Sequence, residues 1–408
     1  MKTQVRKMMV SLVSEQTIPN ILAILHFQPD NLLFVSTEKM QQKHKVEAIL
    51  QTLKMKGMDF SPDNYQTLVV NQDSIKDCMD KLQRWTEEIN LQNFETIVNL
   101  TGGTKMMSIG AYEVFKDYPC QMIYIPIPRN EFIIPHPPKS VMPPTKLDIR
   151  LNVVEYLTAY GVSVSAEEQQ KAKERGERAL ERFEKTAFIY EHYLKLKPFL
   201  KAICSELRAL GSSSIKKIKK GKKIEVSFYF QALLDDHLKR FLHDWDFEYS
   251  SKNGRLSITC IINHDLYHYF IGGWLEEYVY KLLCDLKPKG ITDVQLNLQL
   301  ISPKGTQNEF DVMFTYENAL YFVECKSLDQ EHDKEQDILY KIGALQTDFG
   351  LRINAFLATQ TEKIFDQRGE IKEHLKQRAE QMHTVILPLL QIKDLKDRLT
   401  QELFTASG

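Results

Sequence analysis

The sequence predicts an α/β protein with an N-terminal doubly wound sheet, a helical middle region and a C-terminal α/β domain. Three observations support this. The first 135 residues alternate apolar strands with helices, and residues 166–210 place apolar positions at helical spacing among dense Glu, Lys and Arg. From about residue 255 the pattern changes to strand, helix, hairpin, strand and helix. A chain of 408 residues has room for two or three domains.

The N-terminal elements follow one another regularly. Strands are expected at residues 8–13 and in NLLFVST, QTLVVNQ, ETIVNL and QMIYIPI. Helices are expected after Pro19, over 38–56, near 73–91 and near 104–117. Helical crossovers of this length join parallel strands, so the sheet should be mostly parallel. The segment MIYIPI–PRN–EFIIP predicts a hairpin at the sheet edge.

The Pro-rich stretch 135–145 predicts a linker. We therefore expect an N-terminal domain over 1–138, a linker and helical, winged-helix-like connector over 139–254, and a C-terminal domain over 255–408. The segment GSSSIKKIKKGKKIEV (211–226) predicts a flexible, solvated turn that leads into a strand. Its lysines could contact phosphates, but a solvated surface run is the preferred interpretation.

Composition excludes several classes of protein. Hydrophobic residues make up 43% and charged residues 26%, which is enough apolar surface for packed cores. Lys plus Arg number 53 against 54 for Asp plus Glu, so the chain is not polybasic, although a local basic patch is still possible. No apolar run is long enough for a transmembrane helix, and the N-terminal apolar run is too short for a secretory signal. The cysteines form no CxxC pair or His/Cys cluster, which favours a reducing cytoplasm over disulfides or a zinc site.

A C-terminal hairpin carries the strongest chemical signal. In QNEFDVMFTYENALYFVECKS (307–327), two apolar strands flank a turn centred on Glu317 and Asn318. Pairing across this turn puts Asp311 opposite Glu324 and Glu309 opposite Lys326. The pleat directs alternate positions to the other face, into the core: Phe310, Val312, Val323 and Cys325.

Carboxylates beside a lysine are what a metal-dependent phosphodiesterase needs. Mg²⁺ or Mn²⁺ prefers oxygen ligands, polarises the scissile phosphate and activates a water. The lysine can orient that water or neutralise charge that builds up in the transition state. The alternative is a half-exposed hairpin with a cross-strand ion pair such as Glu309–Lys326.

The arrangement Asp311…Glu324-Cys325-Lys326 resembles the PD-(D/E)XK nuclease superfamily, although the residues up to Asp311 depart from a literal Pro-Asp. The resemblance implies a restriction-endonuclease-like α/β domain in which Asp311 and Glu324 bind metal and Lys326 assists catalysis. In GGWLEEYVYKLL (272–283), Glu276 matches the upstream acidic residue of that superfamily as a further metal ligand, with Glu277 as its solvated neighbour. A downstream helix with Tyr340, Lys341 and Gln346 resembles the helix beside such sites, where solvent exposure of Lys341 and Gln346 is the preferred interpretation.

A glycine-containing turn is the second informative site. Thr101-Gly102-Gly103-Thr104-Lys105 leads from a strand into an apolar helix, where free backbone N–H groups favour phosphate. The threonines are also good N-caps, so a plain strand-to-helix turn is the alternative. The loop after the first strand, with Ser14, Glu15 and Gln16, should open at the same sheet edge. Thr37 either joins it or caps the following helix. Neither GxGxxG nor GxxxxGK[ST] occurs, which disfavours a dehydrogenase or a P-loop ATPase.

With the nuclease-like domain behind it, this arrangement resembles a CRISPR-associated Rossmann-fold (CARF) sensor fused to a nuclease, as in type III CRISPR ancillary nucleases. The resemblance implies a cytoplasmic homodimer that binds cyclic oligoadenylate and cleaves DNA, RNA or both in antiviral defence. It assigns ring binding to Ser14, Glu15 and Gln16 and to residues 101–105. We expect the four-membered ring, cyclic tetra-adenylate, and one ring per dimer, because a symmetric ring suits a two-fold interface.

Two other functions are open at this point. One is a nucleotide-sensing regulator that holds nucleic acid without cutting it, which the intact Asp311, Glu324 and Lys326 disfavour. The other is a constitutive repair or restriction-type nuclease. The sensor loops and the carboxylate hairpin lie some 200 residues apart in sequence, with the connector between them. We therefore expect the connectors to carry a ligand-driven rotation to the nuclease.

Overall fold

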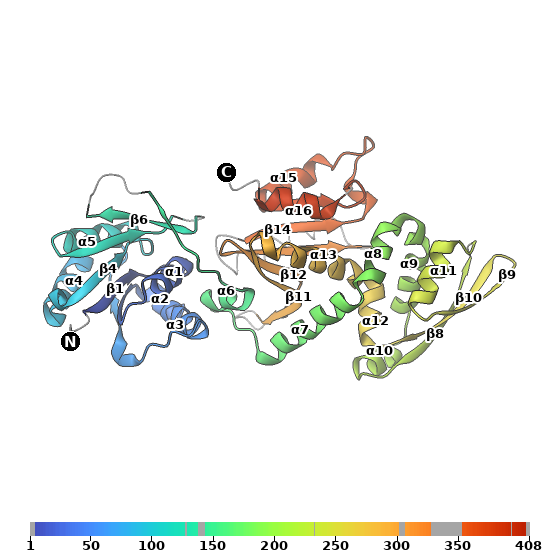
Figure 1. The fold of residues 1–408 in the computed structure, drawn as a ribbon, viewed down its shortest axis with the longest axis horizontal. Helices are drawn as coiled ribbons and strands as arrows, with labels where there is room; N and C mark the ends of the chain where they lie inside the picture. The colour runs from blue at the N-terminus through green and yellow to red at the C-terminus, as the bar shows by residue number, and fades with distance from the viewer. Residues whose placement is uncertain are drawn as a thin grey trace.

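The computed structural model describes residues 5–126, 129–137, 143–231, 233–301, 307–327, 353–392 and 394–404. Figure 1 shows the N-terminal sheet at one end, the C-terminal sheet in the middle, and most of the connector at the other end. The order in space therefore differs from the order in sequence. The expectation that the connector separates the two domains is wrong, because the C-terminal domain lies directly beside the N-terminal one.

The N-terminal sheet has seven strands in the order β3-β2-β1-β4-β5-β6-β7. The first five in this order pair in parallel, while β5–β6 and β6–β7 are antiparallel, which confirms the predicted doubly wound sheet with an edge hairpin. The strands are β1 (Arg6–Leu12), β2 (Asn31–Ser36), β3 (Tyr65–Val69), β4 (Phe94–Asn99), β5 (Cys120–Tyr124), β6 (Glu131–His136) and β7 (Thr145–Lys146).

The helices of this domain are α1 (Ile18–Phe27), α2 (Glu38–Gln42), α3 (Lys45–Met55), α4 (Ile75–Ile89) and α5 (Lys105–Phe115). The expected single helix over 38–56 is wrong, because α2 and α3 are separate. His44 between them has a φ of 50°, a left-handed conformation that no right-handed helix can continue through.

The Pro-rich stretch 135–145 is not simply a linker. Strand β6 extends to His136 and β7 begins at Thr145, while residues 138–142 lie outside the described part of the chain. Helix α6 (Val153–Ala159) then packs on the N-terminal domain, where the Thr17 hydroxyl donates to the Ala159 carbonyl over 2.6 Å. We therefore propose that this domain extends past the expected boundary at 138, to about residue 160.

The connector contains α7 (Ala166–Glu181), α8 (Phe183–Glu191), α9 (Tyr193–Arg208), α10 (Ser212–Lys219), β8 (Ile224–Gln231), α11 (Asp236–Asp244), β9 (Glu248–Lys252) and β10 (Arg255–Ile262). Its strands form an antiparallel sheet in the order β8-β10-β9, with a wing-like hairpin at Asn253-Gly254. The expected boundary after residue 254 would cut this sheet, so we propose that the connector ends near residue 263.

The expected flexible turn over GSSSIKKIKK is wrong as well. Residues Ser212–Lys219 form α10, because Ile218 is only 1% exposed and anchors the helix in the apolar core of the connector. The burial of one apolar side chain each turn is enough to order a lysine-rich segment.

The C-terminal domain is built on a five-stranded sheet in the order β11-β12-β13-β14-β15. The pairs β11–β12 and β12–β13 are antiparallel, and the pairs β13–β14 and β14–β15 are parallel. The elements are α12 (His264–His268), a π-helical turn (Tyr269–Gly273), α13 (Trp274–Asp285), β11 (Ile291–Ile301), β12 (Gln307–Tyr316), β13 (Ala319–Lys326), β14 (Ile353–Thr359), α15 (Glu373–Gln381), β15 (Thr384–Pro388) and α16 (Leu395–Phe404).

Both faces of this sheet are buried. On one face Val312 and Val323 join the apolar core of the connector, which includes Trp274 of α13. On the other, Phe310 and Phe322 join a cluster that continues through α6 into the N-terminal sheet. The C-terminal sheet is thus packed between its two neighbours.

All six cysteines are free thiols: Cys78, Cys120, Cys204, Cys260, Cys284 and Cys325. Within the described ranges, no helix combines the length and apolar composition needed to cross a membrane.

Candidate active site and ligand edge

Helix α13 enters the site through a sharp bend at two glycines. Gly272 has a φ of 147°, and a Cβ there would lie 3.1 Å from the Ser327 hydroxyl oxygen. A Cβ on Gly273 would meet the carbonyl oxygen of His268 at 2.9 Å. Only glycine fits this bend comfortably, and the bend turns Glu276 on the first turn of α13 toward the sheet.

The β12–β13 hairpin has the predicted register. Val312 pairs with Val323 and Tyr316 with Ala319, and the turn residues Glu317 and Asn318 both have left-handed φ values, 48° and 55°. This is the backbone of a tight hairpin turn with the expected central residues. The expected pairing is confirmed from Val312 to the turn.

Asp311 lies just beyond this regular ladder and reaches across it. Its Oδ2 accepts a hydrogen bond from the backbone N–H of Cys325 at 2.7 Å, which brings its carboxylate beside Glu324. Glu324 is 3% exposed, and its Oε1 lies 3.0 Å from the Lys326 ammonium nitrogen. The alternative pair Glu309–Lys326 does not occur, since Lys326 pairs with Glu324.

The sheet distorts next to Asp311. Asn297 of β11 has a left-handed φ of 51° and donates from Nδ2 to Glu276 Oε2 at 2.6 Å. The expectation that Phe310 shares a face with Val312, Val323 and Cys325 is wrong, because Phe310 packs in the cluster toward the N-terminal domain. A left-handed residue in a strand interrupts the regular alternation of faces.

Burial and neighbouring carboxylates raise the pKa of Asp311 and of Glu276. Burial, then the charges of Glu324 and Glu276, raises the pKa of Asp311 well above its ordinary value. Burial and the neighbouring Glu309 and Glu324 raise the pKa of Glu276 to about 7, against the hydrogen bond from Asn297. Burial disfavours the Lys326 ammonium, but Glu324 and Asp311 outweigh it and raise the pKa of Lys326. Three carboxylates thus face one lysine, and the raised pKa values of Asp311 and Glu276 mean that ionising all three is unfavourable without a further cation.

This donor set fits a hard divalent cation. Glu276, Asp311 and Glu324 offer carboxylate oxygens, the ligands that Mg²⁺ and Mn²⁺ prefer. Among the described residues, no three His, Cys, Asp or Glu side chains already converge as a complete metal group. Glu324 instead pairs with Lys326, so cation binding would require this carboxylate to exchange partners.

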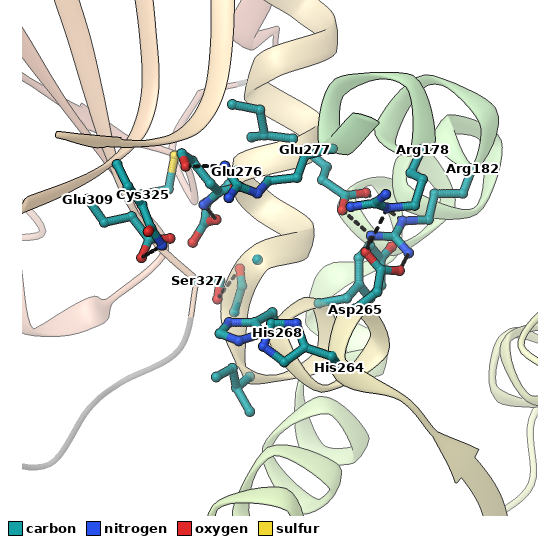
Figure 2. A pocket seen from close by; sticks show the side chains of 18 of the residues that line it. Arg178, Arg182, His264, Asp265, His268, Glu276, Glu277, Glu309, Cys325 and Ser327 are labelled. Carbon is teal, nitrogen blue, oxygen red and sulfur yellow. Dashed lines mark hydrogen bonds and ion pairs between the residues drawn. The ribbon is translucent and has the colours of Figure 1, made fainter. Parts of the chain in front are cut away.

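Glu277 has a different environment from Glu276. The expectation of a solvated neighbour is wrong, because Glu277 is 7% exposed and accepts a hydrogen bond from Arg182 Nε of α7 at 2.7 Å. Arg182 also pairs with Asp265, to which Arg178 donates at 3.2 Å (Figure 2). Two arginines therefore balance two carboxylates.

A cavity of about 490 Å³ opens between the carboxylate cluster and the connector. Glu276, Glu309 and Lys326 line its sheet side, and His264 and His268 line it near Ser327 (Figure 2). The connector adds basic residues: Arg175, Arg178, Arg182, Arg208 and Lys219.

These basic residues differ in availability. Arg175, Arg178 and Arg182 form ion pairs with Glu168, Asp265 and Glu277. Arg208 and Lys219 are exposed, and none of the described acidic side chains pairs with either.

The sequence interpretation missed Asn297, the His264/His268 pair and the cavity position of Lys219. The i, i+4 spacing in HDLYH was a usable signal, whereas Asn297 in LNLQL looks like any polar position of an alternating strand. Tyr340, Lys341 and Gln346 lie outside the described residues.

Two family models match the chain. Residues 8–156 match the Card1 CARF domain, and residues 264–400 match the endonuclease domain of Card1-like proteins. The chain is a fusion of a CARF domain with a Card1-like endonuclease domain. The comparison with curated proteins found no match.

Solved structures share the whole fold. Protein VC1899 from Vibrio cholerae superposes with a TM-score of 0.72 at 20% identity, over 98% of this chain and 99% of that one. Can2 from Sulfobacillus thermosulfidooxidans, in complex with cyclic tetra-adenylate, gives 0.68 at 18% identity over 98% of both chains. A type III CRISPR defence DNA nuclease activated by cyclic oligoadenylate gives 0.50 at 15% identity, over 93% of this chain and 52% of that one.

The two predicted ligand loops of the CARF domain meet at one sheet edge. A Cβ on Gly102 would lie 1.9 Å from the carbonyl oxygen of Leu12, so glycine lets the later loop press against the end of β1. Beneath them, Asn20 Nδ2 donates to the Ser11 hydroxyl and the Leu12 carbonyl, both at 2.8 Å. Asn20 is fully buried and its Oδ1 accepts no hydrogen bond.

The loop after β1 is held from several sides. The Ser14 hydroxyl accepts from the Gln16 N–H at 3.2 Å, and exposed Glu15 pairs with Lys43 at 2.6 Å. Gln16 Oε1 accepts from the Tyr160 hydroxyl at 2.9 Å, while its Nε2 is buried without a partner. Lys43 and Tyr160 are contacts that the sequence did not reveal.

Most of the predicted threonines already have structural partners. Thr37 caps α2 and Thr104 caps α5, as the alternative interpretation held. The Thr101 hydroxyl accepts from the Ile125 N–H at 2.8 Å and donates to Asn99 Oδ1 at 2.7 Å. Lys105 is exposed at the first position of α5, beside Gly103.

Proposed function

We propose that this protein is a metal-dependent nuclease of type III CRISPR antiviral defence that cyclic oligoadenylate activates in the cytoplasm. The carboxylate cluster beside Lys326 carries the proposal, because Glu276 and Lys326 line a cavity whose connector side is basic. The family match of both domains supports it, as do two structural relatives, Can2 in complex with cyclic tetra-adenylate and a type III CRISPR defence DNA nuclease.

In this proposal Asp311, Glu324 and Glu276 hold Mg²⁺ or Mn²⁺. The bound cation would polarise the scissile phosphate and lower the pKa of a water. Asn297 keeps the Glu276 carboxylate oriented through its 2.6 Å hydrogen bond. Lys326, which pairs with Glu324 at 3.0 Å, would lie close enough to a phosphate held by this cation to neutralise its charge.

The substrate is DNA, RNA or both. Arg208 and Lys219 reach the same cavity as Lys326 and have no acidic partner among the residues described here, so they suit the flanking phosphates of a strand. Arg182 is a poor candidate for this role, because Glu277 and Asp265 already neutralise it.

The activator is cyclic tetra-adenylate, bound across a homodimer by Ser14, Glu15, Gln16, Thr37 and residues 101–105. Met106, Ile109 and Tyr112 form an apolar stripe on α5, with exposures of 38%, 46% and 37%. The opposite side of α5 packs on α4, where a Cβ on Gly110 would lie 3.1 Å from Cys78. The stripe starts next to Lys105, so a second copy packed against it would bring both ligand edges together.

Cleavage tests this function. The purified protein is incubated with a supercoiled plasmid and with single-stranded RNA, in Mn²⁺, with and without cyclic tetra-adenylate. We expect ring-dependent cleavage, and a loss of at least ~10²-fold in rate for Glu324→Ala, Asp311→Ala and Lys326→Ala. No cleavage in any tube would favour the regulator, and equal cleavage without the ring would favour the constitutive nuclease.

Calorimetry tests the ligand site. We expect one ring per dimer and weaker binding by the double variant Lys105→Ala/Thr104→Ala. Since Thr104 also caps α5, the matched control is Thr104→Ser, which keeps the cap and should bind normally. One ring per monomer, or full affinity of the double variant, would contradict this site.

A further inference from the structure

The tip of the carboxylate hairpin is held by the CARF side of the molecule. Asn318, which is 7% exposed, accepts from the Leu151 N–H at 2.9 Å through Oδ1. Its Nδ2 donates to Asn130 Oδ1 at 2.9 Å and to the Ile149 carbonyl at 2.8 Å. One buried side chain of the endonuclease domain therefore makes three hydrogen bonds to the CARF side: two to the segment that leads into α6 and one to Asn130 before β6.

The adjoining turn residue makes the same connection by charge. Glu317 pairs with Arg150 at 3.2 Å and also accepts a hydrogen bond from Asn130. Arg150 at the same time donates to the Leu147 carbonyl at 2.7 Å, which fixes the segment that receives the hairpin. We call the contacts of Glu317 and Asn318 with Asn130 and residues 149–151 the clasp.

The clasp borders the predicted ligand loop. A small cavity is lined by Glu317 and Asn318 on the hairpin side, and by Gln16 and Tyr160 on the CARF side. Gln16 belongs to the loop after β1, and its buried Nε2 has no hydrogen-bond partner. A displacement of this loop can therefore reach the hairpin tip through side chains that line one cavity.

The hairpin is stiff enough to transmit such a displacement. The ladder is regular from the turn to the Val312–Val323 pair, and both faces are buried against apolar clusters. Asp311 and Glu324 each lie six residues from the turn, about 20 Å along a strand. A shift at the tip therefore displaces both carboxylates relative to Glu276, which is on a separate helix.

We propose that Asn318 is a positioning residue through which the CARF domain sets the placement of Asp311 and Glu324. This inference rests on the proposed function and concerns its regulation. The β12–β13 hairpin, not the connector, couples ring binding in the CARF domain to the position of the carboxylates. A ring that binds the two placements of the loop with different affinities then shifts the carboxylates between two arrangements. The same coupling acts in reverse, so loss of the clasp changes ring affinity.

The test uses the full-length protein with Asn318→Gly, which keeps the left-handed turn but removes all three hydrogen bonds. The matched control is Asn253→Gly, since Asn253 has a φ of 52° in the exposed β9–β10 turn of the connector. Asn130→Ala breaks the clasp from the CARF side, in case Asn318→Gly does not fold. The measured quantity is the ratio of the cleavage rates with and without cyclic tetra-adenylate.

We expect this ratio to fall at least ~10-fold in Asn318→Gly and in Asn130→Ala, with ring stoichiometry preserved and Asn253→Gly unchanged. Wild-type ratios in both clasp variants would overturn the inference. If the wild-type protein shows no ring-dependent cleavage, the proposed function fails and hydrogen exchange decides on the clasp. Faster exchange in residues 14–17 and 312–326 of both clasp variants would support it, and unchanged exchange would overturn it.

Discussion

Two consecutive residues of α13, Glu276 and Glu277, belong to two different acidic clusters. Glu277 faces α7, where Arg178 and Arg182 balance it together with Asp265. Glu276 faces the sheet, where it joins Asp311 and Glu324 with Lys326 as the one nearby cation among the residues described. The first cluster has two arginines for two carboxylates, and we call it the balanced cluster. The second has one lysine for three carboxylates, and we call it the unbalanced cluster.

The difference suits the first cluster to a structural role and the second to the catalytic role that we propose. A balanced, buried ion-pair network joins two parts of the fold and asks for no ligand. Burial and neighbouring carboxylates raise the pKa of Asp311 and of Glu276, so ionising all three carboxylates together is unfavourable unless a divalent cation binds them. The same residue type in adjacent positions thus has two different electrostatic environments, and four predictions test this contrast.

The largest effect should come from the balanced cluster. Arg182→Ala leaves Glu277 and Asp265 buried without their main partner, so it should lower the free energy of unfolding by about 3–5 kcal/mol. Urea unfolding of the metal-free protein measures this. Arg240→Ala, which removes an exposed pair with Asp244, is the control and should cost under about 1 kcal/mol. Equal losses in the two variants would remove the contrast.

Cation binding should stabilise the unbalanced cluster. Mg²⁺ or Mn²⁺ at a hundredfold excess over its Kd should raise the free energy of unfolding by about 2.7 kcal/mol in the wild type. Glu324→Gln should abolish this gain. Asp285→Asn, at the far end of the same helix, should keep it. A full cation effect in Glu324→Gln would show that the cation binds elsewhere.

The pH dependence of stability follows from Glu276. Its pKa is raised from 4.5 to about 7 in the folded chain, so the folded state holds the proton more tightly than the unfolded state. The stability that this adds is present below pH 4.5 and is lost as the pH rises through 7. In EDTA, Glu276→Gln should lose less stability than the wild type between pH 4.5 and 8. Parallel pH profiles of the two proteins would contradict this.

The smallest effect concerns Arg208 and Lys219, the two basic residues of the cavity lining without an acidic partner among the described residues. Lys219→Ala and Arg208→Ala should each weaken binding of a single-stranded oligonucleotide a few-fold. Each should also reduce, by about one, the steepness with which the logarithm of the binding constant falls with the logarithm of the salt concentration. Lys217→Ala on the same helix as Lys219 is the control, because Lys217 is exposed and does not line the cavity. If all three variants bind alike, the cavity is not the path of the strand.

Much of the fold and of the site was accessible from local patterns. Alternating apolar positions and a Glu-Asn turn gave the hairpin and its register, since both depend on residues a few positions apart. The alternation of strands and helices gave the parallel sheet for the same reason. The local pattern gave a wrong prediction at GSSSIKKIKK. The helix there depends on Ile218 packing into a core formed by residues far away in the sequence.

The sequence by itself pointed to the residues to which we assign the chemistry: Asp311, Glu324, Lys326 and an acidic pair on one helix. Only the tertiary structure decided that Glu276 turns to the carboxylates and Glu277 to Arg182, a partner 95 residues away. It also put the endonuclease domain against the CARF domain, with Asn318 in contact with a segment 167 residues earlier. The physical reason is that turns and periodicity are set by neighbouring residues, whereas the partner of a buried polar group is fixed by the packing of distant elements.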